Sequence, residues 1–219
     1  MAGWESGLEQ HGSAVLNQTL VERLRAALSD SSSRPPMLLE GDDVLAPVTP
    51  PGGEALSPAA VLVPIVDRPE PGVILTQRSD KLRRHAGQVA FPGGRIDPGD
   101  DGPIAAALRE AEEEIGLPAS AVEIIGIADR YRTVTGYEVT PVVGVIPPDL
   151  HFVIHDAEVA AVFEVPLAHL LEPANYVEQA VEWQGRERHY FEITYDGHRI
   201  WGATAAMIVN LGRRLRYQS

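Results

Sequence analysis

An acidic helix placed shortly after a pair of glycines is the feature that most constrains this chain. The acidic run is residues 109–117, Arg-Glu-Ala-Glu-Glu-Glu-Ile-Gly-Leu, and the glycines are residues 93–94. A helix turns by about 100° per residue, so steps of three and four residues bring side chains to one face. Glu110, Glu113 and Glu114 are related by such steps. The sequence therefore predicts three carboxylates on one helix face.

The apolar residues of the same helix fall on a different arc. Ile104, Leu108, Ala111 and Ile115 follow one another at steps of four, three and four, which predicts the buried face. No lysine follows the glutamates at i+4, so we expect them to repel one another with nothing cationic on their face. An isolated cluster of this kind is most often a solvated acidic face. Because Mg²⁺ is held by a few carboxylates together with substrate phosphates, the glycines upstream favour a metal site instead.

The two glycines close a short apolar run. Residues 89–91, Val-Ala-Phe, predict a strand that ends in a tight turn at Gly93 and Gly94. Glycine adopts backbone conformations that other residues avoid, and it lets a ligand approach the main chain. Residues 95–103 contain two prolines, two glycines and three aspartates, which predicts a loop leading into the acidic helix.

Gly94 and the run 109–117 together resemble the signature of the Nudix hydrolases. In that signature an acid follows the glycine after five residues, and Arg-Glu follows the acid after seven. Here eight residues separate Asp100 from Arg109, so either Asp100 or Asp101 takes the acid position, as aspartate, with one residue inserted in the loop. The resemblance implies an α/β fold, an α/β/α sandwich with a mixed β-sheet, and hydrolysis of a diphosphate linked to another group.

A second motif precedes the glycines. Ile-Leu-Thr-Gln-Arg-Ser at residues 74–79 is followed, at intervals of three residues, by Arg83, Gly87 and the run 91–94. This pattern is similar to the extra signature of the coenzyme A pyrophosphatase branch of the family, and residues 200–204 resemble the end of that branch. The resemblance implies coenzyme A as substrate, with 3′,5′-adenosine bisphosphate and 4′-phosphopantetheine as products. ADP-ribose or a dinucleotide is the alternative substrate, and a ligand-sensing module without turnover is a further alternative.

Positive charge is concentrated beside this motif, although the formal net charge of the chain is −13. Five potentially cationic groups lie within eight positions: Arg78, Lys81, Arg83, Arg84 and His85. Guanidinium groups bind phosphate oxygens through charge-assisted hydrogen bonds, whereas a solvated turn with local ion pairs is the alternative. We predict that Arg78 and Arg83, with the backbone of Gly93 and Gly94, bind the substrate.

The helix supplies the predicted catalytic residues. Glu110, Glu113 and Glu114 would hold Mg²⁺ or Mn²⁺ directly or through water. The resemblance implies that Arg109 orients this carboxylate cluster, with an ordinary ion pair within the helix as the alternative. One glutamate acts as general base, and Glu110 is our choice among the three. An acid from a distant loop could complete the metal site, and Asp156, Glu158 and Glu164 are the candidates. For each of them, a role as an ordinary exposed surface charge is the alternative.

The amino-acid composition excludes or disfavours several kinds of function. The chain has no cysteine, which excludes thiol nucleophiles, thiolate metal sites and disulfides. Its acidic balance disfavours a broad nucleic-acid surface. Residues 1–13 lack the apolar core of a signal peptide, and no stretch reaches the length of a membrane span, so we expect a cytoplasmic protein with no membrane partner. A homodimer is implied only by the resemblance.

The order of patterns predicts one catalytic domain at residues 56–219, behind an N-terminal extension at residues 1–55 that ends in a linker rich in proline, glycine and serine. Within the extension, residues 16–28 predict a short amphipathic helix that packs against the domain. The remaining predictions are strands at 60–66, 73–77, 122–128, 138–146 and 159–165, a late hairpin at 176–183 and 188–194, and a closing helix at 202–215. Tyr131, Tyr137 and Trp183 are weighed as partners of an adenine ring, with core packing as the alternative.

Overall fold

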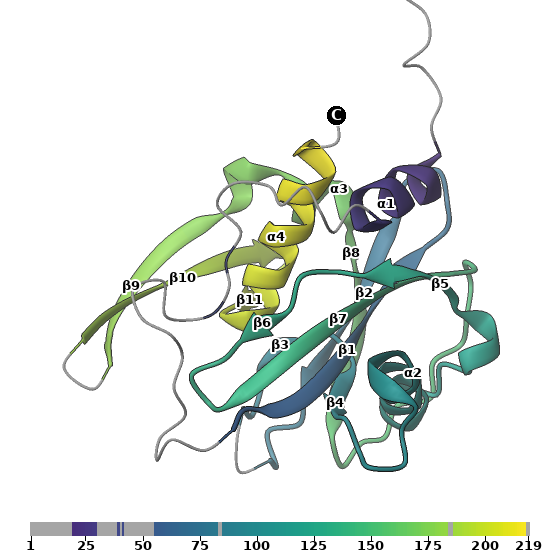
Figure 1. Ribbon diagram of the computed structural model, residues 1–219, viewed down its shortest axis with the longest axis horizontal. Helices are drawn as coiled ribbons and strands as arrows, with labels where there is room; N and C mark the ends of the chain where they lie inside the picture. Colours follow the sequence, from purple (N-terminus) through teal and green to yellow (C-terminus); the bar gives the residue numbers. More distant parts are fainter. Residues whose placement is uncertain are drawn as a thin grey trace, which may run out of the picture.

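A mixed eight-stranded β-sheet forms the centre of the molecule, and a three-stranded antiparallel sheet extends from its side (Figure 1). The computed structural model describes residues 19–29, 39, 41, 55–82, 85–183 and 186–217. The strands of the large sheet are β1 (Ser57–Val66), β2 (Gly72–Arg78), β3 (Val89–Ala90), β4 (Gly93–Arg95), β5 (Glu123–Ile127), β6 (Tyr131–Arg132), β7 (Tyr137–Ile146) and β8 (Val159–Pro166). The smaller sheet contains β9 (Val177–Trp183), β10 (Arg186–Tyr195) and β11 (His198–Trp201).

Helices cover both faces of the large sheet. They are α1 (Leu20–Ser29), α2 (Gly102–Ile115), α3 (Leu167–Leu171) and α4 (Ala203–Tyr217), with 3₁₀ turns η1 (Ala119–Ala121) and η2 (Pro173–Asn175). Helix α2 lies on one face, and α1 and α4 lie on the other (Figure 1). This arrangement of helix, sheet and helix layers confirms the predicted α/β/α sandwich.

Strand β1 organises the sheet and divides the core. It pairs with β7 in parallel along its whole length and with β2 and β4 in antiparallel fashion. Successive side chains of a strand point to opposite faces. Val63 and Ile65 accordingly pack in the core under α1 and α4, whereas Leu62 and Val66 pack in the core under α2.

Helix α2 packs closely because small side chains face the sheet. Its fully buried apolar residues are Ala106, Ala107, Ala111 and Ile115. Of the four residues that the sequence predicts for the buried face, Ala111 and Ile115 are buried, whereas Ile104 and Leu108 are only half-buried. The helix starts with Pro103 in its first turn and ends at Gly116, whose φ of 66° is the left-handed conformation that glycine adopts readily.

The predicted turn at the two glycines is wrong, because they form a strand. In β4, Gly93 pairs with Val61 and Gly94 with Ala60 of β1. A Cβ atom on Gly93 would lie 2.4 Å from the carbonyl oxygen of Ala60, and a Cβ on Gly94 would lie 2.5 Å from the carboxyl carbon of Glu110. Glycine is needed here for close approach within a sheet.

Helix α1 is part of the core, as predicted from its leucine spacing. Leu24 and Ala27 are fully buried, and the helix packs against α4 and β5. Arg214 of α4 donates hydrogen bonds to both carboxylate oxygens of Asp129 and one, of 3.4 Å, to the carbonyl of Ala27. The predicted linker after this helix lies almost wholly outside the described residues.

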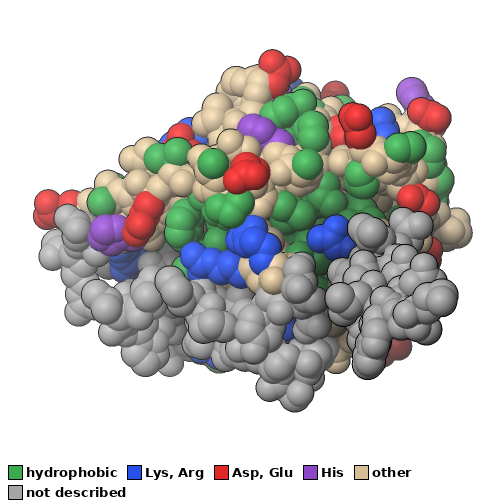
Figure 2. Space-filling model, turned by 90° about the horizontal axis from the view of Figure 1, so that it is seen from above, with side chains coloured by type: hydrophobic (Ala, Val, Ile, Leu, Met, Phe, Trp, Pro, Cys, Tyr) green, Lys and Arg blue, Asp and Glu red, His purple; other side chains and the backbone are tan. Residues whose placement is uncertain are grey.

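The surface charge is uneven. Seen from the side where α1, α3 and the end of α4 lie, basic side chains gather beside apolar surface while most acidic ones lie toward the rim (Figure 2). The last turn of α4 contributes the exposed Arg216 to this end of the molecule, whereas Arg214 of the same turn is buried. No helix in the described ranges is both long enough and apolar enough to cross a bilayer.

Candidate functional site

Arg109 joins the acidic residues of the loop and of helix α2. Its Nε and Nη2 donate to the two carboxylate oxygens of Asp100, each at 3.0 Å. Its Nη1 donates to Glu110 and to Glu113, also at 3.0 Å. The expectation that nothing cationic lies on the acidic face is therefore wrong. A guanidinium presents several N–H donors in a fixed plane and can contact three carboxylates at once.

The structure distinguishes the two aspartates that the sequence left open. Asp100 contacts Arg109 and also accepts a hydrogen bond of 2.8 Å from the backbone N–H of Asp97. The hydrogen bonds from Arg109 hold the pKa of Asp100 below its usual range. Asp101 is exposed at the start of α2. The longer loop thus keeps an acid beside Arg109, and that acid is Asp100.

Glu114 is the most deeply buried carboxylate of the helix, with 4% of its surface exposed. Its Oε2 accepts a hydrogen bond of 3.1 Å from the backbone N–H of Gly93, and its Oε1 lies 3.8 Å from Nη1 of Arg78. Burial raises the pKa of Glu114 to about 7, because removal from water disfavours the charged form more than these two partners stabilise it. The side chain of Glu114 therefore extends from helix α2 toward strands β2 and β4.

The other two glutamates differ from Glu114 and from each other. Glu110 is half-buried against Gly94, and burial raises its pKa while Arg109 opposes that rise. The side chain of Glu113 is 60% exposed, and it accepts a hydrogen bond from Arg109. Two of the three predicted carboxylates thus turn inward, while Glu113 lies on the solvent side.

The inward carboxylates suit a hard divalent cation, although they do not form a closed ligand set. Within the described chain, no three acidic or histidine side chains stand together at metal-binding distances. Glu110 and Glu114 nevertheless repel each other, and the charge of Glu158 raises the pKa of both. Carboxylates that are buried and mutually repelling are stabilised by a nearby positive charge, and oxygen donors are those that Mg²⁺ and Mn²⁺ prefer.

Of the three distant acids considered from the sequence, only Glu158 influences the helix glutamates in this way. Its backbone carbonyl accepts a hydrogen bond of 2.8 Å from the N–H of Ser79, which joins its loop to the end of β2. Glu164 pairs instead with Arg68 at 2.8 Å. Asp156 is an exposed turn residue.

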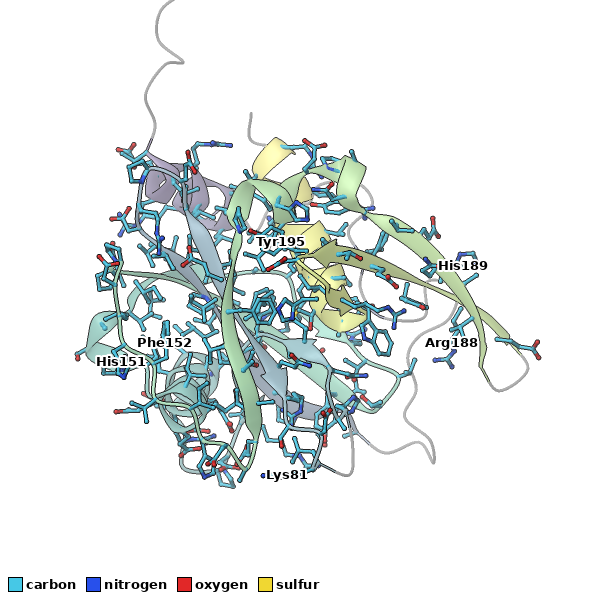
Figure 3. The ribbon with its side chains drawn as sticks, turned by 180° about the vertical axis from the view of Figure 1, so that it is seen from behind. Lys81, His151, Phe152, Arg188, His189 and Tyr195 are labelled. Carbon is cyan, nitrogen blue, oxygen red and sulfur yellow. The ribbon has the colours of Figure 1, made fainter. Side chains whose placement is uncertain are left out.

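The predicted basic group is only partly described. Arg78 is close to Glu114, and its backbone N–H donates to the carbonyl of Gln88 at 2.9 Å. Arg83 and Arg84 lie outside the described residues, so the prediction for Arg83 is untested. Lys81 lies at the end of the molecule where β4 and the start of α2 lie (Figures 1 and 3).

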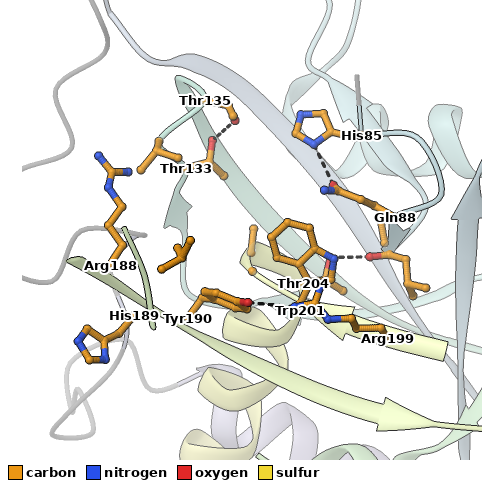
Figure 4. Close-up of a pocket in the computed structure, with 16 residues that line it drawn as sticks. His85, Gln88, Thr133, Thr135, Arg188, His189, Tyr190, Arg199, Trp201 and Thr204 are labelled. Atoms are coloured by element: carbon orange, nitrogen blue, oxygen red, sulfur yellow. Dashed lines mark hydrogen bonds between the residues drawn. The ribbon is translucent and has the colours of Figure 1, made fainter. Parts of the chain in front are cut away.

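A cavity of about 580 Å³ lies between residues 85–90, the turn at residues 133–135 and the smaller sheet, and the chain runs from its wall at Ala90 to Gly93 of the acidic site. His85 and Gln88 line one side of it, with 2.8 Å between Nδ1 and Oε1, and Tyr190 and Trp201 line another (Figure 4). Residues 201–204, most of the segment at 200–204 singled out in the sequence, also line this cavity.

The sequence did not identify Arg188, Tyr190 and Arg199 as cavity residues. Their one sequence signal is that they lie just before the segment at residues 200–204. The aromatic residues considered for stacking lie elsewhere: Tyr131 is buried in the core, and the hydroxyl of Tyr137 accepts a hydrogen bond of 3.1 Å from Arg95. The side chain of Trp183 is outside the described set.

The model of the NUDIX domain matches residues 56–194. The proteins named uncharacterized Nudix hydrolase NudL from Escherichia coli strains K12 and O7:K1 are each 52% identical to this chain over 157 residues, which is 72% of this chain and 82% of theirs.

Solved structures of similar shape include an Ap4A hydrolase of C. elegans, with 22% identity and a TM-score of 0.44 over 50% of this chain and 80% of that one. Another is the Nudix hydrolase RenU of M. smegmatis, with 25% identity and a TM-score of 0.45 over 53% of this chain and 74% of that one. The family match and the bacterial relatives, taken with the acidic helix beside paired glycines, show that the chain belongs to the Nudix hydrolase family.

Proposed function

We propose that this protein hydrolyses the diphosphate bond of coenzyme A or its derivatives, releasing 3′,5′-adenosine bisphosphate and 4′-phosphopantetheine or its acylated form. Nudix hydrolases act on nucleoside diphosphate derivatives and generally use divalent metal ions. One observation carries the narrower proposal: Arg78, from the motif that resembles the coenzyme A branch, lies 3.8 Å from the buried carboxylate of Glu114. This contact supports a single site formed by that motif and the acidic helix.

In this proposal Glu110 and Glu114 hold Mg²⁺ or Mn²⁺ directly or through water, with Glu113 at the outer edge. The bound cation would neutralise charge that develops on the diphosphate during attack by water. Arg109 acts as a positioning residue, because its guanidinium fixes Asp100, Glu110 and Glu113 relative to one another.

Substrate contacts come from the strands beside the helix. Arg78, and Arg83 as predicted from the motif, would bind diphosphate oxygens through charge-assisted hydrogen bonds. The backbone of Gly93 and Gly94 lies close to the glutamates: Gly93 donates its N–H to Glu114, and a Cβ on Gly94 would collide with Glu110. Absence of side chains at these two positions lets the main chain of β4 approach the acidic helix closely, so that its backbone groups can take part in binding.

Glu110 is the proposed general base. It is half-buried, and burial raises its pKa, which increases the basicity of its carboxylate. Glu114 is the alternative, because burial raises its pKa to about 7. Rates measured for Glu110→Gln and Glu114→Gln over a range of pH separate the two, since loss of the base removes the acidic limb of the rate profile.

Product analysis by liquid chromatography and mass spectrometry tests the proposal. The purified protein is incubated with Mg²⁺ or Mn²⁺ and with coenzyme A, acyl-coenzyme A, ADP-ribose, dinucleotides or nucleoside triphosphates. Preferred release of 3′,5′-adenosine bisphosphate from coenzyme A is the expected result. Glu110→Gln is the inactive comparison, and Glu112→Gln, an exposed glutamate on the same helix, is the matched control.

Two other outcomes of this experiment would each reject part of the proposal. Preference for ADP-ribose or a dinucleotide would reject coenzyme A as the substrate while retaining hydrolysis at the acidic helix. Absence of hydrolysis on every compound would favour a ligand-sensing module. We also propose, on resemblance, a cytoplasmic homodimer in which residues 56–219 form the hydrolase domain and residues 1–55 an extension. Light scattering on the purified protein tests the dimer.

A further inference from the structure

The cavity beside the acidic site has the lining of a binding pocket. Its volume is about 580 Å³, within the usual range of about 300–1,000 Å³ for small-molecule sites. Val89 and Ala90 contribute apolar surface, and Thr133 and Thr135 contribute hydroxyl groups, which lie 2.9 Å from each other. Apolar walls with a few polar groups are typical of sites that bind a cofactor or nucleotide.

Arg188 of β10 is the unusual residue of this cavity. Its Nε and Nη1 atoms are buried, and neither donates a hydrogen bond to any described residue. Buried guanidinium N–H groups without acceptors are costly, because they have lost water and gained nothing in exchange. Figure 4 shows Arg188 on one side of the cavity with Thr133, opposite His85 and Gln88. An anionic group bound at this side would supply the missing acceptors.

The guanidinium of Arg199, in contrast, already has hydrogen-bond acceptors within the protein. It donates hydrogen bonds of 2.7 Å to Glu192 and 2.9 Å to the hydroxyl of Tyr190, and it stacks over the ring of Trp201 at 5.0 Å. The rings of Tyr190 and Trp201 lie 5.6 Å apart at an angle of 61°. Arg199 thereby fixes two aromatic side chains at the cavity wall, where a planar ring can stack.

Some residues that line the cavity lie close to residues of the acidic site. Strand β3 lines the cavity, and it leads through Phe91 and Pro92 to Gly93. Ala90 and Gly93 are three residues apart, so their Cα atoms are separated by at most about 11 Å. Gln88, which lines the cavity, accepts a hydrogen bond of 2.9 Å from the backbone N–H of Arg78, whose side chain reaches Glu114.

We propose that this cavity binds the nucleoside end of the substrate, with the base against Tyr190 and Trp201 and a phosphate group outside the cleaved diphosphate on Arg188. The inference rests on the proposed function for the identity of the ligand as a nucleoside diphosphate derivative with an additional phosphate. An aromatic base, a phosphate and a diphosphate at the acidic helix then occupy three adjoining regions.

Calorimetric titration of the metal-free protein with 3′,5′-adenosine bisphosphate, 5′-AMP and pantetheine tests this assignment without turnover. We expect the bisphosphate to bind more tightly than 5′-AMP. Arg188→Gln should weaken bisphosphate binding about tenfold or more and bring it close to that of 5′-AMP, since a charged hydrogen bond to phosphate is lost. Arg188→Lys, which retains charge without the planar fork, should fall between the two.

Arg130→Gln is the matched control, because it removes the same charge from an exposed arginine that pairs with Glu138. Equal affinity of the wild type and Arg188→Gln for the bisphosphate would overturn the inference, as would tight binding of pantetheine alone. Hydrolysis of coenzyme A with Arg188-independent binding would reject the cavity assignment and keep the function. Arg188-dependent binding without hydrolysis of coenzyme A would do the reverse.

Discussion

Replacing Glu114 by glutamine should raise the stability of the metal-free protein while it lowers turnover. The carboxylate is 4% exposed, and burial raises its pKa to about 7. The folded state therefore binds a proton more tightly than the unfolded chain does, so stability falls as pH rises from about 4.5 to about 7. Glutamine has nearly the same shape, and its amide oxygen can still accept the hydrogen bond from Gly93.

The size of the effect follows from the two pKa values. The ordinary value is 4.5 and the folded value about 7, and each pH unit corresponds to about 1.4 kcal/mol, so the upper bound is about 3 kcal/mol at pH 8. Relaxation of the site and water penetration reduce this figure, and a gain of about 1–3 kcal/mol is the expected range. With Mg²⁺ present, turnover should fall by orders of magnitude because an oxygen ligand with full charge is lost.

Urea denaturation of wild type and Glu114→Gln in EDTA, from pH 5 to pH 8, measures the effect. The difference in unfolding free energy should be small at pH 5 and should grow toward pH 8 in favour of the variant. Glu113→Gln is the control, because that side chain is 60% exposed and its removal should leave the pH dependence nearly unchanged. Parallel curves for wild type and Glu114→Gln would refute the reasoning, as would near-normal turnover of the variant.

Three further predictions concern other parts of the site and core. Gly94→Ala should lower kcat about 100-fold, because its Cβ would lie 2.5 Å from the carboxyl carbon of Glu110, whereas Gly99→Ala, with nothing within 4 Å, should have little effect in the same steady-state assay. Asp129→Asn should lower the free energy of unfolding by about 3 kcal/mol in urea titrations, since it breaks a pair with Arg214 in which both side chains are 10% exposed. Chelation with EDTA should abolish hydrolysis, and added Mg²⁺ or Mn²⁺ should restore it and raise Tm; activity that survives chelation would contradict a metal-dependent site.

The acidic helix could be predicted from the sequence because its information is local. Residue spacing on a helix fixes which side chains share a face. Spacing places Arg109 four residues before Glu113, but it could not show that Arg109 would also bind Asp100 of the loop, nor that Glu113 would remain exposed while Glu114 became buried. Those differences depend on how far the helix is rotated against β1 and β4, which is a property of the tertiary packing.

Short strands were the main failures in the fold. Strand β4 is three residues long and includes Gly93 and Gly94, so it has no side-chain alternation to detect. Strand β11 was missed although its signal was present: Asp196 and Gly197, with φ of 46° and 78°, form the two-residue turn that joins it to β10. An Asp-Gly pair is a strong indicator of such hairpins.

The cavity beside the acidic site was beyond sequence reasoning because its walls come from distant segments. Gln88 follows β2, Thr133 precedes β7, and Tyr190 lies on the smaller sheet. No spacing rule relates residues whose proximity is created only when the two sheets pack against each other. Tests of Arg188 are therefore also tests of that packing.

Helix α1 has a practical consequence for anyone who trims this chain. A protein that starts at residue 56 would keep the whole region matched by the family model, yet it would uncover the surface now packed against Leu24 and Ala27. It would also leave Arg214 without the carbonyl of Ala27 as an acceptor. Freshly exposed apolar surface of this kind promotes aggregation, so shortened versions intended for crystallisation or assay should begin upstream of Leu20.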